Sequence, residues 1–199
     1  MDLINRIKQI LVSPKAEWQT IDGENDSHVA VLTKYVLLLA AIPAVAAFIG
    51  YGVIGVSFYG GYHIASINWG IRQAIIQYIT IVGGVYITAF VIDILAANFG
   101  TQKNFNKAFS LVAYSYTPAM IGGIFYIYYS LAIVAGLVSI YSLYLLYVGL
   151  TPLMKTPEDK CTSYFVASLL VMVATFIVLG LALTAILTGN AYGAYSLRF

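Results

Sequence analysis

An acidic residue inside an apolar run is the feature of this sequence best suited to chemistry. Asp93 is the single charged residue between Gln73 and Gln102. A carboxyl group within a membrane needs a partner or a proton, and such groups often mark paths for protons, ions or solutes. We therefore take Asp93 as the first candidate for an intramembrane functional site. We expect it to pair with a hydroxyl, an amide or a basic group across the bundle, with Lys107 and Lys155 as the nearest plausible cations.

Helical spacing places Asp93 on a face of small side chains. Ala89 and Ala97 lie four positions to either side of it, and Ala96 lies three positions away. We expect this face to turn toward other helices. A second interpretation stays open, in which Asp93 lies within two turns of the inner membrane surface and simply reaches water.

A second group of candidates surrounds a proline in an apolar segment. Pro118 lacks a backbone N–H, and the preceding turn carries the hydroxyls of Tyr114 and Tyr116. Carbonyls freed at such a break must be satisfied by neighbouring helices, hydroxyls or water. The sequence therefore predicts a weakened helix with polar groups in the middle of the membrane.

The next apolar segment adds tyrosines at a spacing of three. Tyr144 stands midway between Tyr141 and Tyr147. Such a row can line a polar path, or it can supply hydrogen bonds between packed helices. The remaining candidates, at the end of this segment, are Thr151, Pro152 and Lys155.

Motifs for enzymatic chemistry were sought and not found. The sequence contains no HExxH, no GxSxG, no phosphate-binding Gly-Lys-Ser/Thr loop and no paired intramembrane acids. His63 has no Cys, Asp or Glu beside it, and the single Cys161 excludes an intramolecular disulfide. We expect a non-enzymatic protein with no catalytic residues, no cofactor and no metal. The net charge of +2 does not suggest a nucleic-acid partner.

The elements that must position these residues are membrane-spanning helices. Hydrophobic residues make up 61% of the 199 and charged residues 9%, whereas soluble domains carry about a quarter charged residues. A crossing needs about 20 apolar residues. We predict an all-α, polytopic integral membrane protein with five transmembrane helices in one bundle. The spans are 35–56, 74–98, a third between Lys107 and an apex near Tyr126, 131–150 and 163–187.

Three regions follow from this division. Residues 1–33 form an amphipathic N-terminal segment and linker, residues 34–188 the transmembrane domain, and residues 189–199 a short external tail. Pro14 is expected to end an N-terminal helix that has apolar residues on one face and Arg6 and Lys8 on the opposite face. That helix either lies on the membrane surface or packs against the protein's own loops.

Basic residues predict the orientation. Eight of the ten Lys and Arg residues fall in segments that share one side of the membrane if the spans alternate, and two of these form the basic turn with Lys103 and Lys107. Arg72 and Arg198 fall on the other side. The positive-inside rule then places the N-terminus in the cytoplasm and the C-terminus outside, as a multi-pass protein of the inner membrane.

Several short segments together resemble the Yip (Ypt-interacting protein) family. They are residues 93–100, the turn at 103–108, 114–118, 149–155 and, in the manner of the bacterial members, 10–18. The resemblance covers most of the chain, and it implies a five-span helical membrane protein with a cytoplasmic N-terminus. Eukaryotic relatives act with Rab-type GTPases through long N-terminal regions, which this chain does not have, so that partner is not expected.

The sequence favours two alternative functions. The first is a membrane scaffold or partner-binding subunit, embedded in the lipid bilayer, with a second copy or another membrane protein as its partner. The alternative is a transporter or channel for a proton, a cation or a small solute that uses Asp93.

Overall fold

The computed structural model describes residues 2–57 and 63–195, with side chains described to residue 186. It contains five helical segments long and apolar enough to cross a membrane, which confirms the predicted fold class. These spans are His28–Ile54, Ile67–Phe99, Phe105–Ile127, Tyr129–Met154 and Glu158–Ile186.

The first span is one continuous helix with changes of winding. It comprises α3 (His28–Val31), the π-helix η1 (Leu32–Val36), α4 (Leu37–Ala47) and a second π-helix η2 (Phe48–Ile54). The helix starts before the predicted Tyr35 because the Ser27 side chain accepts a hydrogen bond from the Ala30 N–H and caps it. Gly50 brings η2 against the third span, since a Cβ there would overlap the Tyr126 carbonyl oxygen.

A short hairpin links the first two spans. Strand β1 (Val56–Ser57) pairs antiparallel with β2 (His63–Ile64), and α5 (Ile67–Ala96) follows, extended by the 3₁₀ turn η3 (Ala97–Phe99). The connection between the predicted spans 35–56 and 74–98 is therefore shorter than expected at its far end, because α5 already begins at Ile67. Its residues 58–62 lie outside the described part of the chain.

The third span is the most buried of the five and is broken as predicted. It consists of α6 (Phe105–Ser115), α7 (Thr117–Gly122) and the 3₁₀ helix η4 (Gly123–Ile127). A 3₁₀ turn, η5 (Tyr129–Leu131), leads into α8 (Ala132–Met154), and α9 (Glu158–Tyr195) ends the described chain. Every residue from Ala108 to Pro118 is buried, so the polar break lies in the core of the bundle.

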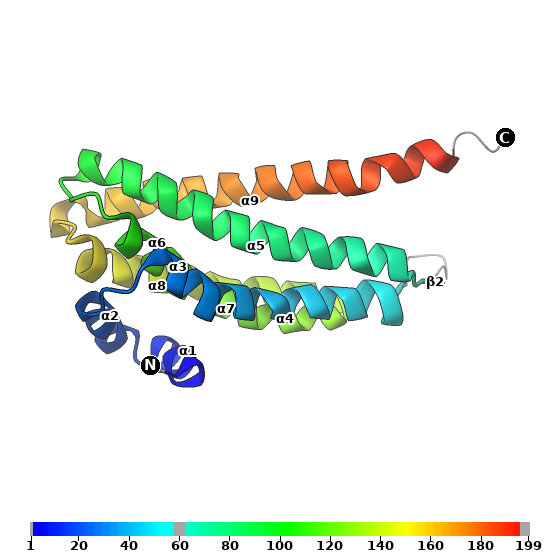
Figure 1. Cartoon of the computed structure of the whole chain (residues 1–199), viewed down its shortest axis with the longest axis horizontal. Coiled ribbons are helices and arrows are strands. Elements are labelled where there is room, and N and C mark those ends of the chain that lie inside the picture. The colour runs from blue at the N-terminus through cyan, green and yellow to red at the C-terminus, as the bar shows by residue number, and fades with distance from the viewer. Residues whose placement is uncertain (1, 58–62, 196–199) are drawn as a thin grey trace.

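Two short helices at the N-terminus form a unit that we call the N-terminal hairpin. They are α1 (Leu3–Val12) and α2 (Pro14–Gly23). Pro14 ends α1 as predicted, but it also begins α2, because a proline in the first turn loses no intrahelical hydrogen bond. The hairpin packs at one end of the bundle, which we call the hairpin end, and the described C-terminal part of α9 lies at the other (Figure 1).

Candidate functional site

The break in the third span is satisfied by side-chain hydroxyls. Because Pro118 has no N–H, the carbonyl of Tyr114 loses its usual helical donor. The Thr117 hydroxyl donates to that carbonyl at 2.6 Å instead, and Tyr35 lies 2.6 Å from the same Thr117 oxygen. Since the Thr117 proton is already used, the Tyr35 hydroxyl must be the donor of the second bond. A hydroxyl thus satisfies the freed carbonyl, but it comes from Thr117 and not from Tyr114 or Tyr116, the residues singled out in the sequence.

Tyr114 contacts both the first span, at the break, and the N-terminal hairpin. Its ring meets Tyr35 edge-on at 4.7 Å and Trp18 at 6.4 Å between centroids, and the Arg6 guanidinium lies 5.3 Å from its centre. Such edge-to-face and cation–π contacts are favourable arrangements for aromatic rings. Tyr114 therefore joins the first span, the third span and the hairpin.

Trp18 anchors the N-terminal hairpin on the bundle. Its side chain is fully buried, and a Cβ at Gly149 would lie 2.7 Å from the indole. Glycine at that position of α8 therefore makes the room that the indole occupies. A second link comes from Tyr141, whose hydroxyl donates to the Leu11 carbonyl at 2.9 Å. The structure shows this segment packed against the spans of the protein rather than its loops, and its position on the membrane surface stays a prediction.

A buried ionic cluster links α1 to α2 within the N-terminal hairpin. Arg6 is 4% exposed and Glu17 is 5% exposed, and their side chains pair at 2.5 Å. The same guanidinium donates to both oxygens of Glu24 at 2.6 and 2.5 Å. Burial disfavours the charge on Arg6, but the hydrogen bond and charge of Glu24, with Tyr114 and Glu17, outweigh it and raise the Arg6 pKa above its ordinary value. Arginine is suited to such a site because it stays charged and binds carboxylates with two donors.

The two lysines expected near Asp93 are held elsewhere. Lys155 forms an ion pair with Asp22, and Lys107 lies 3.5 Å from the same carboxylate. Lys107 also donates to the carbonyls of Ile21 and Glu24, at 3.4 and 3.0 Å. The expected pairing of Asp93 with Lys107 or Lys155 is therefore wrong, because the last turn of α2 and the residue after it supply the acceptors.

The Asp22 carboxylate responds to this environment. Partial burial alone would raise its pKa, but the hydrogen bond and charge of Lys155, together with the charge of Lys107, lower the pKa below its ordinary value. Lys155 is the first residue after α8 and has a left-handed backbone conformation, with φ 51°. Its side chain reaches Asp22 from there. Lys103, the other residue of the basic turn, is exposed.

Asp93 is half-buried on α5, near the hairpin end. Its Oδ1 atom is buried and has no hydrogen-bond partner in the described part of the chain. Its neighbour is Tyr164 of α9, which interacts with its charge and donates its hydroxyl to the Ile92 carbonyl at 2.6 Å. Tyr164 is fully buried and stacks on Phe99. The sequence analysis missed this residue, which no pattern in α9 distinguishes.

The remaining candidates lie near the surface of α8. Tyr144 is 44% exposed and stacks on Tyr141, and Thr151 is exposed with its hydroxyl 3.5 Å from the Cys161 sulfur. Pro152 lies within α8, which continues to Met154. The tyrosine row thus makes packing contacts on the outside of the bundle.

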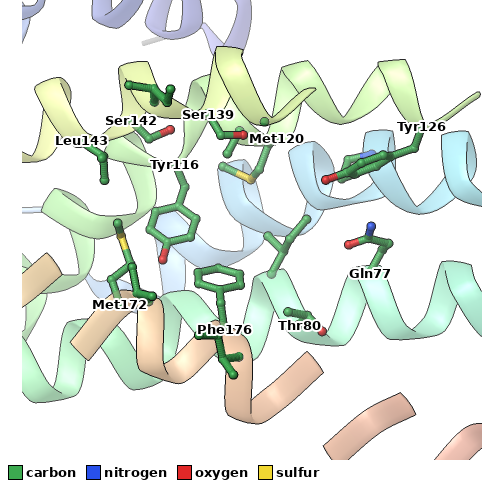
Figure 2. A pocket seen from close by; sticks show the side chains of 17 residues that line it. Gln77, Thr80, Tyr116, Met120, Tyr126, Ser139, Ser142, Leu143, Met172 and Phe176 are labelled. Atoms are coloured by element: carbon green, nitrogen blue, oxygen red, sulfur yellow. The ribbon is translucent and has the colours of Figure 1, made fainter. Parts of the chain in front are cut away.

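A cavity of about 440 Å³ lies in the membrane-spanning part of the protein. All five spans contribute to it, and Figure 2 shows Ser139 and Ser142 on one side with Thr80 and Gln77 on another. The rings of Tyr116 and Phe176 stack at its centre, 5.2 Å apart. Of the candidates from the sequence, Tyr116 lines this cavity, whereas Asp93, Tyr114, Tyr144 and the residues near Lys155 lie outside its lining.

The sequence contains a pattern that could have predicted the cavity. Gln77 and Thr80 continue into Gly84 and Thr88 at steps of three and four, which places polar and small side chains on one face of α5. On α8, Gly136, Ser139 and Ser142 share a face at steps of three. Two such stripes on different spans can meet in a folded bundle.

Comparison with known proteins extends the resemblance seen in the sequence. Residues 8–188 match the Yip1 domain, so the matched region begins within α1 and includes all five spans. Two relatives, both named Inner membrane protein YohC, come from Escherichia coli K12 and Escherichia coli O6:H1. Each is 32% identical over 184 residues, which is 90% of this chain and 93% of the relative. No solved structure matches the chain significantly.

These matches confirm the expected family and the expected location in an inner membrane. The matched region covers the N-terminal hairpin from Lys8, the broken third span and the cavity lining, whereas Arg6 lies before it. The chain is a member of the Yip1-domain family of integral membrane proteins.

Proposed function

We propose that this protein is a non-enzymatic membrane scaffold or partner-binding subunit, oriented with its N-terminus in the cytoplasm. The observation that carries the proposal is the fixed N-terminal hairpin. Trp18 is fully buried against α8 and Arg6 is enclosed by two carboxylates, so the hairpin and the bundle present one continuous rigid surface. A preformed surface lowers the ordering cost of binding a partner.

Charges on this surface suit protein recognition. The hairpin end carries exposed basic residues, including Lys8, Lys15 and Lys103, beside exposed acids, Glu158 and Asp159. Mixed charge of this kind steers association and fixes the register of a partner more than it adds affinity. The partner would be a second copy of this chain or another membrane protein.

The experiment compares assembly with and without the docked hairpin. Fluorescent fusions of the full chain are counted by stepwise photobleaching in native membranes, and crosslinked partners are recovered in parallel. We expect self-association or a specific membrane-protein partner for the wild type, lost in Trp18→Ala. Trp69→Ala, at the opposite end, is the matched control. A wild type that is monomeric and has no specific partner would contradict the proposal.

A second function, proton- or cation-coupled transport, is favoured by one observation. The buried Oδ1 atom of Asp93 has no hydrogen-bond partner among the described residues, as expected of a carboxyl group that exchanges a proton or cation. In proteoliposomes with a potassium diffusion potential and an internal pH dye, wild-type protein would then conduct protons and Asp93→Asn would not. Equal conductance of the two proteins would exclude this version.

A further inference from the structure

We propose that the cavity lined by all five spans, which opens between α8 and α9, binds an uncharged lipid whose headgroup carries a carbonyl oxygen. The site is separate from the N-terminal hairpin, so the inference does not depend on the scaffold function. It rests on four properties of the cavity: where it opens, what charge it tolerates, which hydrogen bonds it offers and how deep it lies.

The cavity opens toward lipid. Among its lining residues, Ile140 is 58% exposed, Val173 48% and Ile177 56%, and these side chains come from α8 and α9. Gly136, also at the cavity, has open space where its Cβ would be. In a membrane-spanning protein, the exposed apolar faces of two helices contact acyl chains. A ligand would therefore enter sideways from the bilayer.

The lining selects against charged headgroups. None of the 17 residues that line the cavity is acidic, basic or histidine. An ionised phosphate or ammonium group moved into such surroundings would lose its hydration without gaining a counter-charge. The occupant must therefore be neutral at the end that enters.

The lining of the cavity contains hydroxyl groups without hydrogen-bond partners among the described residues. Thr80 is 8% exposed and Ser142 is 5% exposed, and neither hydroxyl has a partner among the described residues. Both residues line the cavity from different spans, α5 and α8 (Figure 2). A hydroxyl left unpaired in an apolar environment is costly, so a ligand carbonyl that accepts from it gains binding energy. Gln77 and Tyr126 add further polar groups at one side of the cavity.

The depth of the cavity fits a lipid headgroup that sits below the membrane surface. Met172 and Ile177 are 14 and 19 residues from the start of α9, which corresponds to about 20 and 30 Å along the helix. Met172 lies at the midpoint of the span Glu158–Ile186 and Ile177 beyond it, so the cavity extends from the middle of the bundle away from the hairpin end. Its volume lies within the range of about 300–1,000 Å³ that is usual for small-molecule sites. Quinones and diacylglycerols both combine neutral carbonyl headgroups with apolar tails.

The test uses photolabelling of the full chain in nanodiscs. Diazirine-bearing dioctanoylglycerol, a diazirine-bearing ubiquinone analogue and diazirine-bearing hexadecane are compared, and labelled peptides are mapped by mass spectrometry. We expect saturable labelling of the α8 and α9 segments at the cavity by one or both carbonyl lipids. Labelling by one of them identifies the source, and labelling by both supports the shared chemistry.

Two glycines provide a matched pair of variants. Gly136→Leu fills the cavity mouth, whereas Gly180→Leu on α9 places the same side chain into open space outside the lining. We expect labelling to fall at least tenfold in Gly136→Leu and to stay unchanged in Gly180→Leu. Thr80→Val and Ser142→Ala should each weaken labelling by about three- to tenfold, the size of one lost hydrogen bond.

Two results would overturn the proposal. One is equal, unsaturable labelling by hexadecane and the carbonyl lipids, which would mean ordinary acyl-chain contact. The other is labelling of Gly136→Leu to the same extent as the wild type, which would place the label outside the cavity. Circular dichroism of each variant before labelling confirms that the helical bundle is intact.

Discussion

At the scale of single residues, polar side chains satisfy the break in the third span. Pro118 removes a backbone donor in the most buried span, and the Thr117 hydroxyl replaces it at 2.6 Å. Tyr35, from the first span, then completes the arrangement. A break that would be costly in lipid thus becomes a link between two spans.

Replacing Thr117 by valine tests this link. The valine keeps the shape but leaves the Tyr114 carbonyl and the Tyr35 hydroxyl without partners, so we expect a loss of about 1–3 kcal/mol in the free energy of unfolding. Thermal unfolding in detergent measures it. Thr20→Val, at an exposed hydroxyl of α2, is the control. A melting temperature equal to that of the wild type would show that the break needs no side-chain donor.

Asp22 predicts a pH dependence of hairpin docking. Its pKa is lower in the folded protein than in the unfolded chain, so its contribution is complete above the ordinary value of 3.8 and is lost as pH falls through the lower folded value. Because Lys155 is 68% exposed, we expect less than about 1 kcal/mol. Trp18 fluorescence in a Trp69→Phe background, followed from pH 6 to pH 3, measures the release. Asp22→Asn should reduce this dependence and Asp26→Asn should not.

At the scale of elements, the N-terminal hairpin depends on one large side chain. Trp18→Ala removes a fully buried indole, which costs about 3–5 kcal/mol in a packed core. We expect the amides of α1 and α2 to exchange with deuterium much faster in this variant, while those of α6 keep their protection. Unchanged exchange in the hairpin would show that the ionic cluster of Arg6 holds it without the indole.

At the scale of the whole molecule, an odd number of spans carries the chain from one side of the membrane to the other. The hairpin end gathers Lys103, Lys107, Lys155 and Lys160 with the N-terminal basic residues, while the described end of α9 lies at the opposite end of the bundle (Figure 1). The positive-inside rule applied to this grouping predicts a cytoplasmic N-terminus, which is the orientation we propose.

Cysteine labelling tests this orientation. In a Cys161→Ser background, single cysteines at the exposed positions Lys8 and Lys103 should react with a membrane-impermeant maleimide in inverted vesicles and be protected in intact spheroplasts. A cysteine at His63, in β2, should show the reverse. Reaction of Lys103→Cys from the outside would reverse the proposed topology.

The sequence was sufficient for the features that depend on neighbours along the chain. The number of spans follows from the lengths of the apolar runs, because an uninterrupted backbone in lipid must satisfy its own hydrogen bonds as a helix. The break at Pro118 follows from a missing N–H, and the end of α1 from Pro14. The family could be recognised for the same reason, since its short motifs mark these turns and breaks.

Only the tertiary structure decided which polar groups meet. Lys155 was expected near Asp93, but it pairs with Asp22, 133 positions away, because the C-terminal end of α2 lies beside the end of α8. The cavity likewise combines polar stripes of α5 and α8 with the core tyrosine of the third span. Apolar helices of similar length can pack in many orders, so contacts between them depend on how bulky and small side chains fit together, as Trp18 fits against Gly149.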